Sequence, residues 1–207
     1  MQSSAASVTG EGRTAPLPAA RGVGARLALG RAGARVRERR IVRDAQRGSD
    51  AAFAALFRMH APGAYRAAWL VVRDGAAAED IVQESFLAAV RALDRFDRRR
   101  PFGPWLHRIV VNRAIDAARS RALRREVDAA AAGEPAAEAP SPPLSDELTA
   151  ALAQLGPDQR AVVALRYLLE YKPGEIAALL ELPRGTVNSR MRRALDRLAE
   201  LLEEERA

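Results

Sequence analysis

Hydrophobic residues recur along most of the chain at intervals of three and four positions. Leu148, Leu152 and Leu155 are one example, and Val187, Met191 and Ala194 are another. This spacing places the apolar side chains on one face of an α-helix. Nowhere does the sequence alternate apolar and polar residues over a strand-length run. The pattern therefore predicts an all-α protein.

Two segments lack this periodicity and divide the chain. Residues 1–40 are rich in Ala, Gly, Ser and Arg, which predicts a disordered basic N-terminal extension. It could contact nucleic acid or simply be solvated. Residues 124–144 are rich in Ala, Pro and Glu and predict a flexible acidic linker. Two small helical domains remain, covering residues 41–123 and 145–203.

The first domain is predicted to begin with short helices. Ser49 or Asp50 can cap the first of them, Pro62 and Gly63 interrupt it, and a second helix follows as far as the Asp74-Gly75 turn. A further helix is expected over residues 77–93. The side chains predicted to form its buried stripe are Val82, Phe86, Ala89, Val90 and Leu93.

The opposite face of the 77–93 helix carries Asp80, Gln83 and Glu84, with Leu87 among them. An exposed apolar side chain surrounded by carboxylates suits docking against a basic protein surface. A plain solvated helix face explains the same residues equally well.

Residues 95–105 form a basic segment with interleaved aromatic side chains. Arginines neutralise phosphates and aromatic rings stack on unpaired bases, so the segment favours nucleic-acid binding. Phe102 and Trp105 could equally be core anchors. In the helix predicted to follow, Arg108, Asn112 and Arg119 share a face.

Residues 175–198 predict two helices joined by a tight turn at Pro183 and Gly185, with Thr186 capping the second helix. The second helix combines an apolar underside with a polar and basic outer face, as a recognition helix in a DNA major groove requires. The alternative is an ordinary helical hairpin with a solvated basic face.

The chain has 207 residues, a net charge of +7 and a sequence pI near 10.9, which favours a polyanionic partner. It contains no cysteine, no apolar run long enough to span a membrane and no recognisable secretory signal, so we expect a cytoplasmic protein. His60 and His107 are the only histidines, and no metal-ligand spacing, phosphate loop or nucleophile motif is present. We therefore expect neither a cofactor nor a small-molecule substrate, and no enzyme.

Four stretches carry a resemblance to a known family. They are AEDIVQESFLAAVRAL (78–93), FDRRRPFGPWLHRIVVNRAIDAARS (96–120), LGPDQRAVVALRY (155–167) and GEIAALLELPRGTVNSRMRRAL (174–195). In this order the chain resembles bacterial RNA polymerase sigma factors of the extracytoplasmic-function (ECF) group. The resemblance implies a region 2-like bundle and a region 4-like helix-turn-helix domain.

The resemblance also implies partners and roles. Such a factor binds core RNA polymerase, at the clamp helices of the largest subunit and the flap of the second-largest. It directs initiation at promoter DNA, and an anti-sigma factor is an expected further partner. The implied polymerase-docking residues are Asp80, Gln83, Glu84 and Leu87. The implied minus-ten readers, which also assist strand opening, are Phe102, Trp105, Arg108, Asn112, Arg113 and Arg119. The implied minus-thirty-five readers are Arg184, Thr186, Ser189, Arg190 and Arg193.

Some features depart from the family pattern. The loop reads RRRPFGP where small polar residues are more common, and Asn188 stands where a basic residue is frequent. A competing hypothesis is a stand-alone helix-turn-helix regulator in which the first domain serves dimerisation or ligand binding. An enzyme acting on nucleic acid has little support, because no catalytic constellation is present.

Overall fold

The computed structural model describes residues 21–127 and 144–204, and all of its regular structure there is helical. The part from Val36 onward packs as one compact unit. Helix α1 (Arg21–Ala45) begins before that residue. Helix formation from Arg21 differs from the expectation that order begins near Ile41. Residues 1–20 and the middle of the predicted linker, 128–143, lie outside the described residues.

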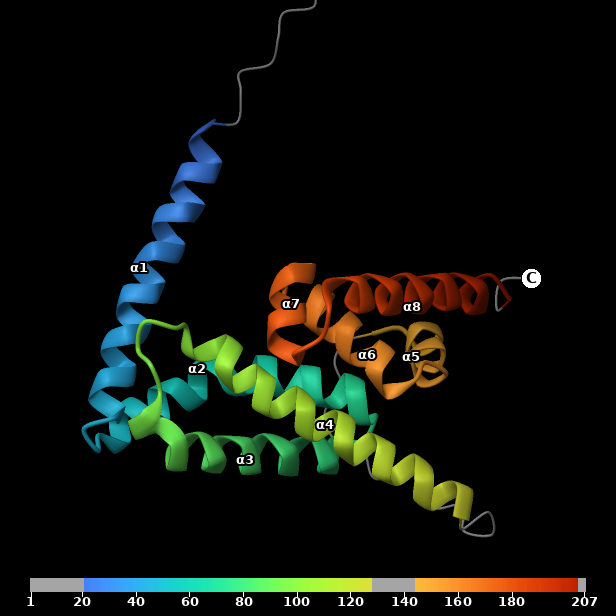
Figure 1. The fold of residues 1–207 in the computed structure, drawn as a ribbon. Coiled ribbons are helices and arrows are strands. Elements are labelled where there is room, and N and C mark those ends of the chain that lie inside the picture. The colour runs from blue at the N-terminus through green and yellow to red at the C-terminus, as the bar shows by residue number, and fades with distance from the viewer. Residues whose placement is uncertain (1–20, 128–143, 205–207) are drawn as a thin grey trace, which may run out of the picture. The chain divides into compact units, whose positions relative to one another are not determined.

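Helices α2 (Asp50–Val72), α3 (Gly75–Ala92) and α4 (Phe102–Val127) pack against one another and form the centre of the first lobe, residues 36–124. Ser49 caps α2, because its side chain accepts a hydrogen bond from the Ala52 N–H. A short 3-10 turn, η1 (Leu93–Arg95), follows α3. Figure 1 shows α3 and α4 beside α2.

Pro62 lies inside α2, so the predicted break at Pro62 and Gly63 was wrong. Proline removes one intrahelical hydrogen bond, but packing can offset that loss. The second half of α2 is buried almost without interruption, including Leu70 and Val71. The helix finally ends at Arg73, whose left-handed backbone has a φ of 59°.

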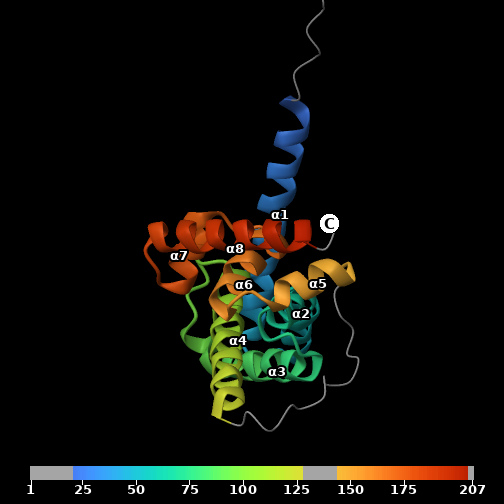
Figure 2. The ribbon, with the colours of Figure 1, turned by 90° about the vertical axis from the view of Figure 1, so that its right-hand side faces the viewer.

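The second lobe, residues 144–204, contains α5 (Asp146–Ala153), α6 (Pro157–Val163), α7 (Pro173–Leu180) and α8 (Arg184–Glu204). A π-helical turn, η2 (Ala164–Leu168), extends α6. Val162, Leu165, Ile176 and Val187 are fully buried in its core. Figure 2 shows α8 lying across α5, α6 and α7, which all contact it.

The two lobes are not separate bodies, because α6 contacts α2 and α4, and α7 contacts α4. Arg160 of α6 is 8% exposed and donates from Nε to the Val71 carbonyl at 2.8 Å. Conversely, Arg73 of the first lobe donates to the Thr149 carbonyl of the second lobe at 3.0 Å. Burial lowers the pKa of Arg160 to about 10, and the neighbouring Arg73 charge adds to this, so Arg160 remains charged at neutral pH. Two helical domains are confirmed, and here they pack together.

Candidate nucleic-acid and protein interfaces

The outer face of α3 presents the predicted docking residues. Asp80, Gln83 and Glu84 are exposed, and Leu87 is 57% exposed. Val90, predicted to be buried, is 44% exposed, so this part of the prediction was wrong and the face carries a second apolar side chain one turn further on. The face thus combines acidic groups with apolar surface that no described residue covers, which is the composition of a protein-docking surface.

Glu84 is held in place by an ion pair across the first lobe. Its carboxylate lies 2.6 Å from Nη1 of Arg113 on α4. Both side chains are more than a third exposed, so the pair adds little stability. It does show that Arg113 points toward α3, away from the face shared by Arg108 and Arg119. Arg113 is therefore placed apart from the other predicted minus-ten residues.

The aromatic residues at the start of α4 form a cluster. Phe102 is fully buried, with its ring centroid 5.9 Å from that of Phe96 and 5.5 Å from that of Trp105. The structure therefore favours the core alternative for Phe102. Trp105 is partly exposed and packs on Phe96, with 4.6 Å between the two ring centroids. Of the two aromatics, only Trp105 offers surface to a ligand without rearrangement.

Helix α4 turns a polar face toward the second lobe. Nη2 of Arg108 lies 2.6 Å from Oε1 of Glu181, in the turn between α7 and α8. Nη2 of Arg119 donates to both carboxylate oxygens of Asp158, at 2.8 and 2.7 Å. Asn112 lies between the two arginines in sequence and is exposed. Two of the three predicted minus-ten arginines, Arg108 and Arg119, are thus paired with acids of the other lobe.

The helix-turn-helix is formed by α7 and α8. Glu181 adopts a left-handed backbone with a φ of 54°, and the Leu182 N–H donates to the Ala177 carbonyl at 2.9 Å, which closes α7. Helix α8 starts at Arg184, so Thr186 lies inside the helix, and the prediction that Thr186 is its N-cap was wrong. Proline supplies the start here, because Pro183 fixes φ just before the first turn.

The outer surface of α8 carries the predicted minus-thirty-five residues. Arg184 and Arg193 are exposed, whereas Thr186, Ser189 and Arg190 are partly buried. The Ser189 hydroxyl donates to the Thr186 carbonyl at 3.0 Å, and Nε of Arg193 donates to the Ser189 carbonyl at 3.3 Å. These local bonds orient the side chains along the helix surface. Val187, Ala194 and Leu198 anchor the opposite face in the core.

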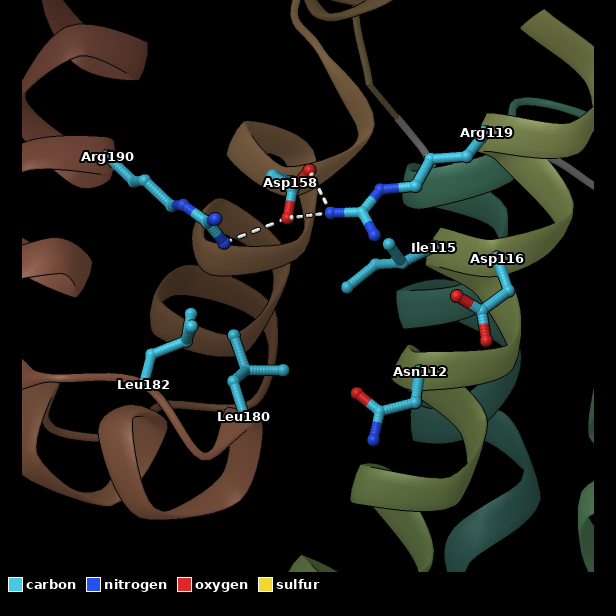
Figure 3. Close-up of a pocket in the computed structure, with 8 residues that line it drawn as sticks. All are labelled: Asn112, Ile115, Asp116, Arg119, Asp158, Leu180, Leu182 and Arg190. Atoms are coloured by element: carbon cyan, nitrogen blue, oxygen red, sulfur yellow. Dashed lines mark hydrogen bonds and ion pairs between the residues drawn. The ribbon is translucent and has the colours of Figure 1, made fainter. Parts of the chain in front are cut away.

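Asp158 joins the two lobes. It accepts from Arg119 of α4 and from Nη1 of Arg190 of α8, the latter at 2.8 Å, and lies between them in Figure 3. Asp158 is the second residue of α6, and nothing local in the sequence indicates its partners. The hollow beside it has a volume of about 340 Å³ and is lined by Asn112, Ile115, Asp116, Arg119, Asp158, Leu180, Leu182 and Arg190.

A buried histidine also lies where the lobes meet. His107 is 8% exposed, and its Nδ1 is 2.8 Å from the Tyr171 hydroxyl of the second lobe. Burial lowers the pKa of His107 to about 4, and the nearby His60 lowers it further, against an opposing effect of Glu38. The Glu38 carboxylate lies 3.0 Å from Nε2 of His60. His107 is therefore neutral in the folded protein at neutral pH, and its role is to pack between the lobes.

The buried neutral state of His107 predicts acid sensitivity. Between pH 6.5 and about 4 the unfolded chain takes up a proton at His107 that the folded protein does not, so stability is lost as the pH falls. At pH 5 the loss is about 2 kcal/mol. We expect His107→Gln to remove this part of the pH dependence, as measured by urea unfolding at pH 7.5 and pH 5. An equal pH dependence in both proteins would contradict the assignment.

Neither a metal site nor a membrane span is found in the described residues. No three His, Cys, Asp or Glu side chains converge there in a way that could hold a metal ion. Within the same residues, no helix is long and apolar enough to cross a membrane.

Comparison with known proteins identifies both lobes. Residues 56–124 match the model of sigma-70 region 2, and residues 145–198 match that of sigma-70 region 4. RNA polymerase sigma factor CarQ of Myxococcus xanthus is 39% identical over 164 residues, covering 76% of this chain and 92% of CarQ. ECF sigma factor SigL of Mycobacterium tuberculosis is 35% identical over 172 residues, covering 76% of this chain and 94% of SigL.

Solved structures agree with the sequence relatives. CnrH in complex with the cytosolic domain of CnrY superposes with a TM-score of 0.62 at 30% identity, covering 81% of this chain and 97% of CnrH. The sigma factor RpoE of Bartonella quintana, in complex with the anti-sigma factor NepR, also gives a TM-score of 0.62, at 27% identity, with 73% of this chain and 96% of that chain covered. The chain belongs to the ECF group of RNA polymerase sigma factors, which direct transcription initiation at specific promoters.

Proposed function

We propose that this sigma factor binds core RNA polymerase through the α3 face defined by Asp80, Gln83, Glu84 and Leu87. In the same proposal α4 serves the minus-ten element and α8 the minus-thirty-five element. The observation that carries it is the exposure of the acidic and apolar α3 face together with that of Arg184 and Arg193 on α8. Acidic and apolar residues favour a basic protein, and exposed arginines favour DNA.

The packed arrangement of the lobes has a consequence for this function. The centres of the minus-ten and minus-thirty-five elements are about 25 base pairs apart, or roughly 85 Å at 3.4 Å per base pair. A compact unit of this length is roughly 40 Å across. The packed lobes cannot reach both elements at once. We therefore propose that the described form is a closed form, and that the lobes separate when the factor engages polymerase and promoter.

The closed form also involves the DNA-reading residues themselves. Arg119 and Arg190, one from each predicted promoter-reading surface, both pair with Asp158, and Arg108 pairs with Glu181. A carboxylate occupies the position that a DNA phosphate or base would take on each arginine. Separation of the lobes would free the guanidinium groups of Arg108 and Arg119 for DNA, because only these two pairs join one lobe to the other.

An anti-sigma factor is a further proposed partner. The solved structures of CnrH and of the Bartonella RpoE contain a bound protein, which for RpoE is an anti-sigma factor. The likeness of this chain to both supports a protein partner of the same class. Co-purification from cells in the absence of core polymerase would identify it.

The decisive experiment is transcription in vitro. A sigma factor is expected to give promoter-specific transcripts only when core polymerase is present. A stand-alone regulator would instead bind a palindromic duplex by itself, because a dimer matches two half-sites. The test uses promoters that the reconstituted holoenzyme enriches. If the chain and core polymerase together give no specific transcript from any of them, the proposal is contradicted.

Reversing the charge of the α3 face is expected to weaken docking strongly. Asp80→Lys with Glu84→Lys places two cations on a surface that we propose faces a basic partner, and like charges across an interface cost several kcal/mol. We expect core affinity to fall at least about tenfold, measured by fluorescence anisotropy with labelled factor. Helicity should be unchanged, because both residues are exposed.

The matched control uses Asp196→Lys with Glu200→Lys, because these exposed acids have the same four-residue spacing on α8. This control should bind core polymerase as the unmodified protein does. Equal losses in both double variants would show that net charge, and not the α3 face, governs binding.

Replacing Arg193 is expected to weaken use of the upstream promoter element. Arg193 is exposed, so Arg193→Ala leaves no unpaired buried group. Loss of a bidentate base contact costs about 1–3 kcal/mol, a reduction of about 5- to 150-fold in promoter binding by the holoenzyme. The control is Arg197→Ala, one turn further along α8 and paired with Glu200. If a scrambled upstream element gives the same reduction, Arg193 does not read bases.

A further inference from the structure

A basic groove lies outside the surfaces described so far. Its lining residues are Val36, Arg39, Arg40 and Arg43 of α1, together with Arg98 of the segment before α4, and they enclose a hollow of about 450 Å³. We call this surface the α1 groove. All five residues are exposed. Figure 1 shows the segment between α3 and α4 next to the C-terminal part of α1.

The fold holds the two walls of the α1 groove together. Nη2 of Arg39 donates to the Arg99 carbonyl at 3.3 Å. The side-chain amide of Gln46, just beyond α1, donates to the carbonyls of Leu93 and Phe96 at 2.8 and 3.0 Å. Buried Val42 and Ala45 attach α1 to the core. The arginines of the groove are therefore brought together by backbone anchors and not by chance contact of flexible side chains.

Little negative charge balances these four guanidinium groups. Asp44 lies 4.0 Å from Arg40 and 3.7 Å from Arg43, in exposed pairs that contribute little. In the part of the chain that the structure describes, neither Arg39 nor Arg98 forms an ion pair. Arg99 and Arg100 next to Arg98 are also exposed and add to the positive charge. Converging cations repel one another, and binding a polyanion relieves that repulsion.

The position of the groove identifies which polyanion fits. Phe96, two residues before Arg98, packs on the partly exposed Trp105 at the start of α4. The α1 groove thus lies beside Trp105 at the start of α4, the helix that we propose serves the minus-ten element. The region 2 match starts at residue 56, so the α1 arginines lie outside the part of the chain that the family model accounts for. Arginines spread along a groove can contact the phosphates of a sugar-phosphate backbone, whereas reading a base requires a side chain that hydrogen-bonds to the base edge.

We propose that the α1 groove binds the phosphate backbone of promoter DNA beside the minus-ten reader. This inference rests on the proposed function. The contact is independent of sequence, so it raises the affinity of the holoenzyme for every promoter by a similar factor. Three phosphates neutralised by Arg40, Arg43 and Arg98 contribute about 2.7 to the slope of log affinity against log salt.

The test measures promoter binding by the holoenzyme between 50 and 200 mM salt. The variant is Arg40→Gln with Arg43→Gln and Arg98→Gln, and it leaves Arg39 in place because Arg39 anchors the loop. Over this salt range the affinity of the unmodified holoenzyme should fall about 40-fold more than that of the variant. The matched control exchanges three other exposed arginines, Arg58, Arg66 and Arg91, for Gln and should keep the steep slope.

Each other outcome overturns the inference. Equal slopes for variant and control show that the α1 groove does not bind phosphate. Weaker binding of the variant to core polymerase alone shows that the groove contacts protein instead. If the unmodified chain does not support specific transcription with core polymerase, the proposed function itself is refuted. If it does, and only the salt slopes of variant and control are equal, the inference about the α1 groove fails by itself. Circular dichroism spectra of the variant, the control and the unmodified protein are compared to check that all three have the same helicity.

Discussion

Phe102→Ala is expected to lower the free energy of unfolding by about 3–5 kcal/mol. Phe102 is fully buried at the start of α4, where its ring meets Phe96, Trp105 and His60. Truncation removes a large apolar side chain and leaves a cavity among rigid aromatic rings. The loss is a large part of the about 5–15 kcal/mol of stability that a folded protein has. Urea unfolding followed by far-UV circular dichroism measures it.

Two further variants separate packing from base contact. Phe102→Leu keeps most of the apolar volume and should recover much of the lost stability. Trp105→Ala acts on a partly exposed ring, so we expect a smaller loss of stability and a specific defect in promoter opening. Permanganate footprinting of unpaired thymines measures that opening. If Phe102→Ala were as stable as the unmodified protein, Phe102 would not be a core residue.

Periodicity in the sequence predicted the helical segments after α1 correctly, because their apolar stripes face one continuous core. Local signals misplaced some boundaries. Pro62 indicated a break that burial of the second half of α2 overrides. Thr186 has the chemistry of an N-cap, yet α8 already begins at Arg184 after Pro183. Val90 fits the helical period, but the neighbouring helices do not reach it.

The candidate site was predictable in composition and not in contacts. The basic and acidic residues that identify a sigma factor can be recognised from their order along the chain. Their partners cannot, because Asp158 and Glu181 meet Arg119 and Arg108 only through packing of the lobes. Burial likewise decides between the two alternatives for Phe102 and requires knowledge of which faces meet. Long-range packing is thus the information that helical periodicity lacks.

Asp158→Asn is expected to favour separation of the two lobes. The carboxylate of Asp158 bonds to Arg119 and Arg190 at once, and without it two guanidinium groups face each other with only a neutral amide between them. Charge-assisted hydrogen bonds are stronger than neutral ones, but Arg119 is 56% exposed, which reduces the effect. We expect the closed form to lose about 1–2 kcal/mol, so the ratio of open to closed protein rises about 5- to 30-fold.

The absence of cysteine makes this shift directly measurable, because Ala76→Cys on α3 and Ala199→Cys on α8 provide the only two labelling positions, both exposed. Double electron–electron resonance between spin labels at these two positions measures the distance between the lobes. Asp196→Asn is the matched control, since Asp196 is an exposed acid of α8 with no ion pair in the described part of the chain. High salt should reduce the difference between the two variants, because it screens exposed charges. If the distance distribution of Asp158→Asn equals that of the control at low salt, the lobes are held by other contacts, such as the hydrogen bond from buried Arg160 to the Val71 carbonyl.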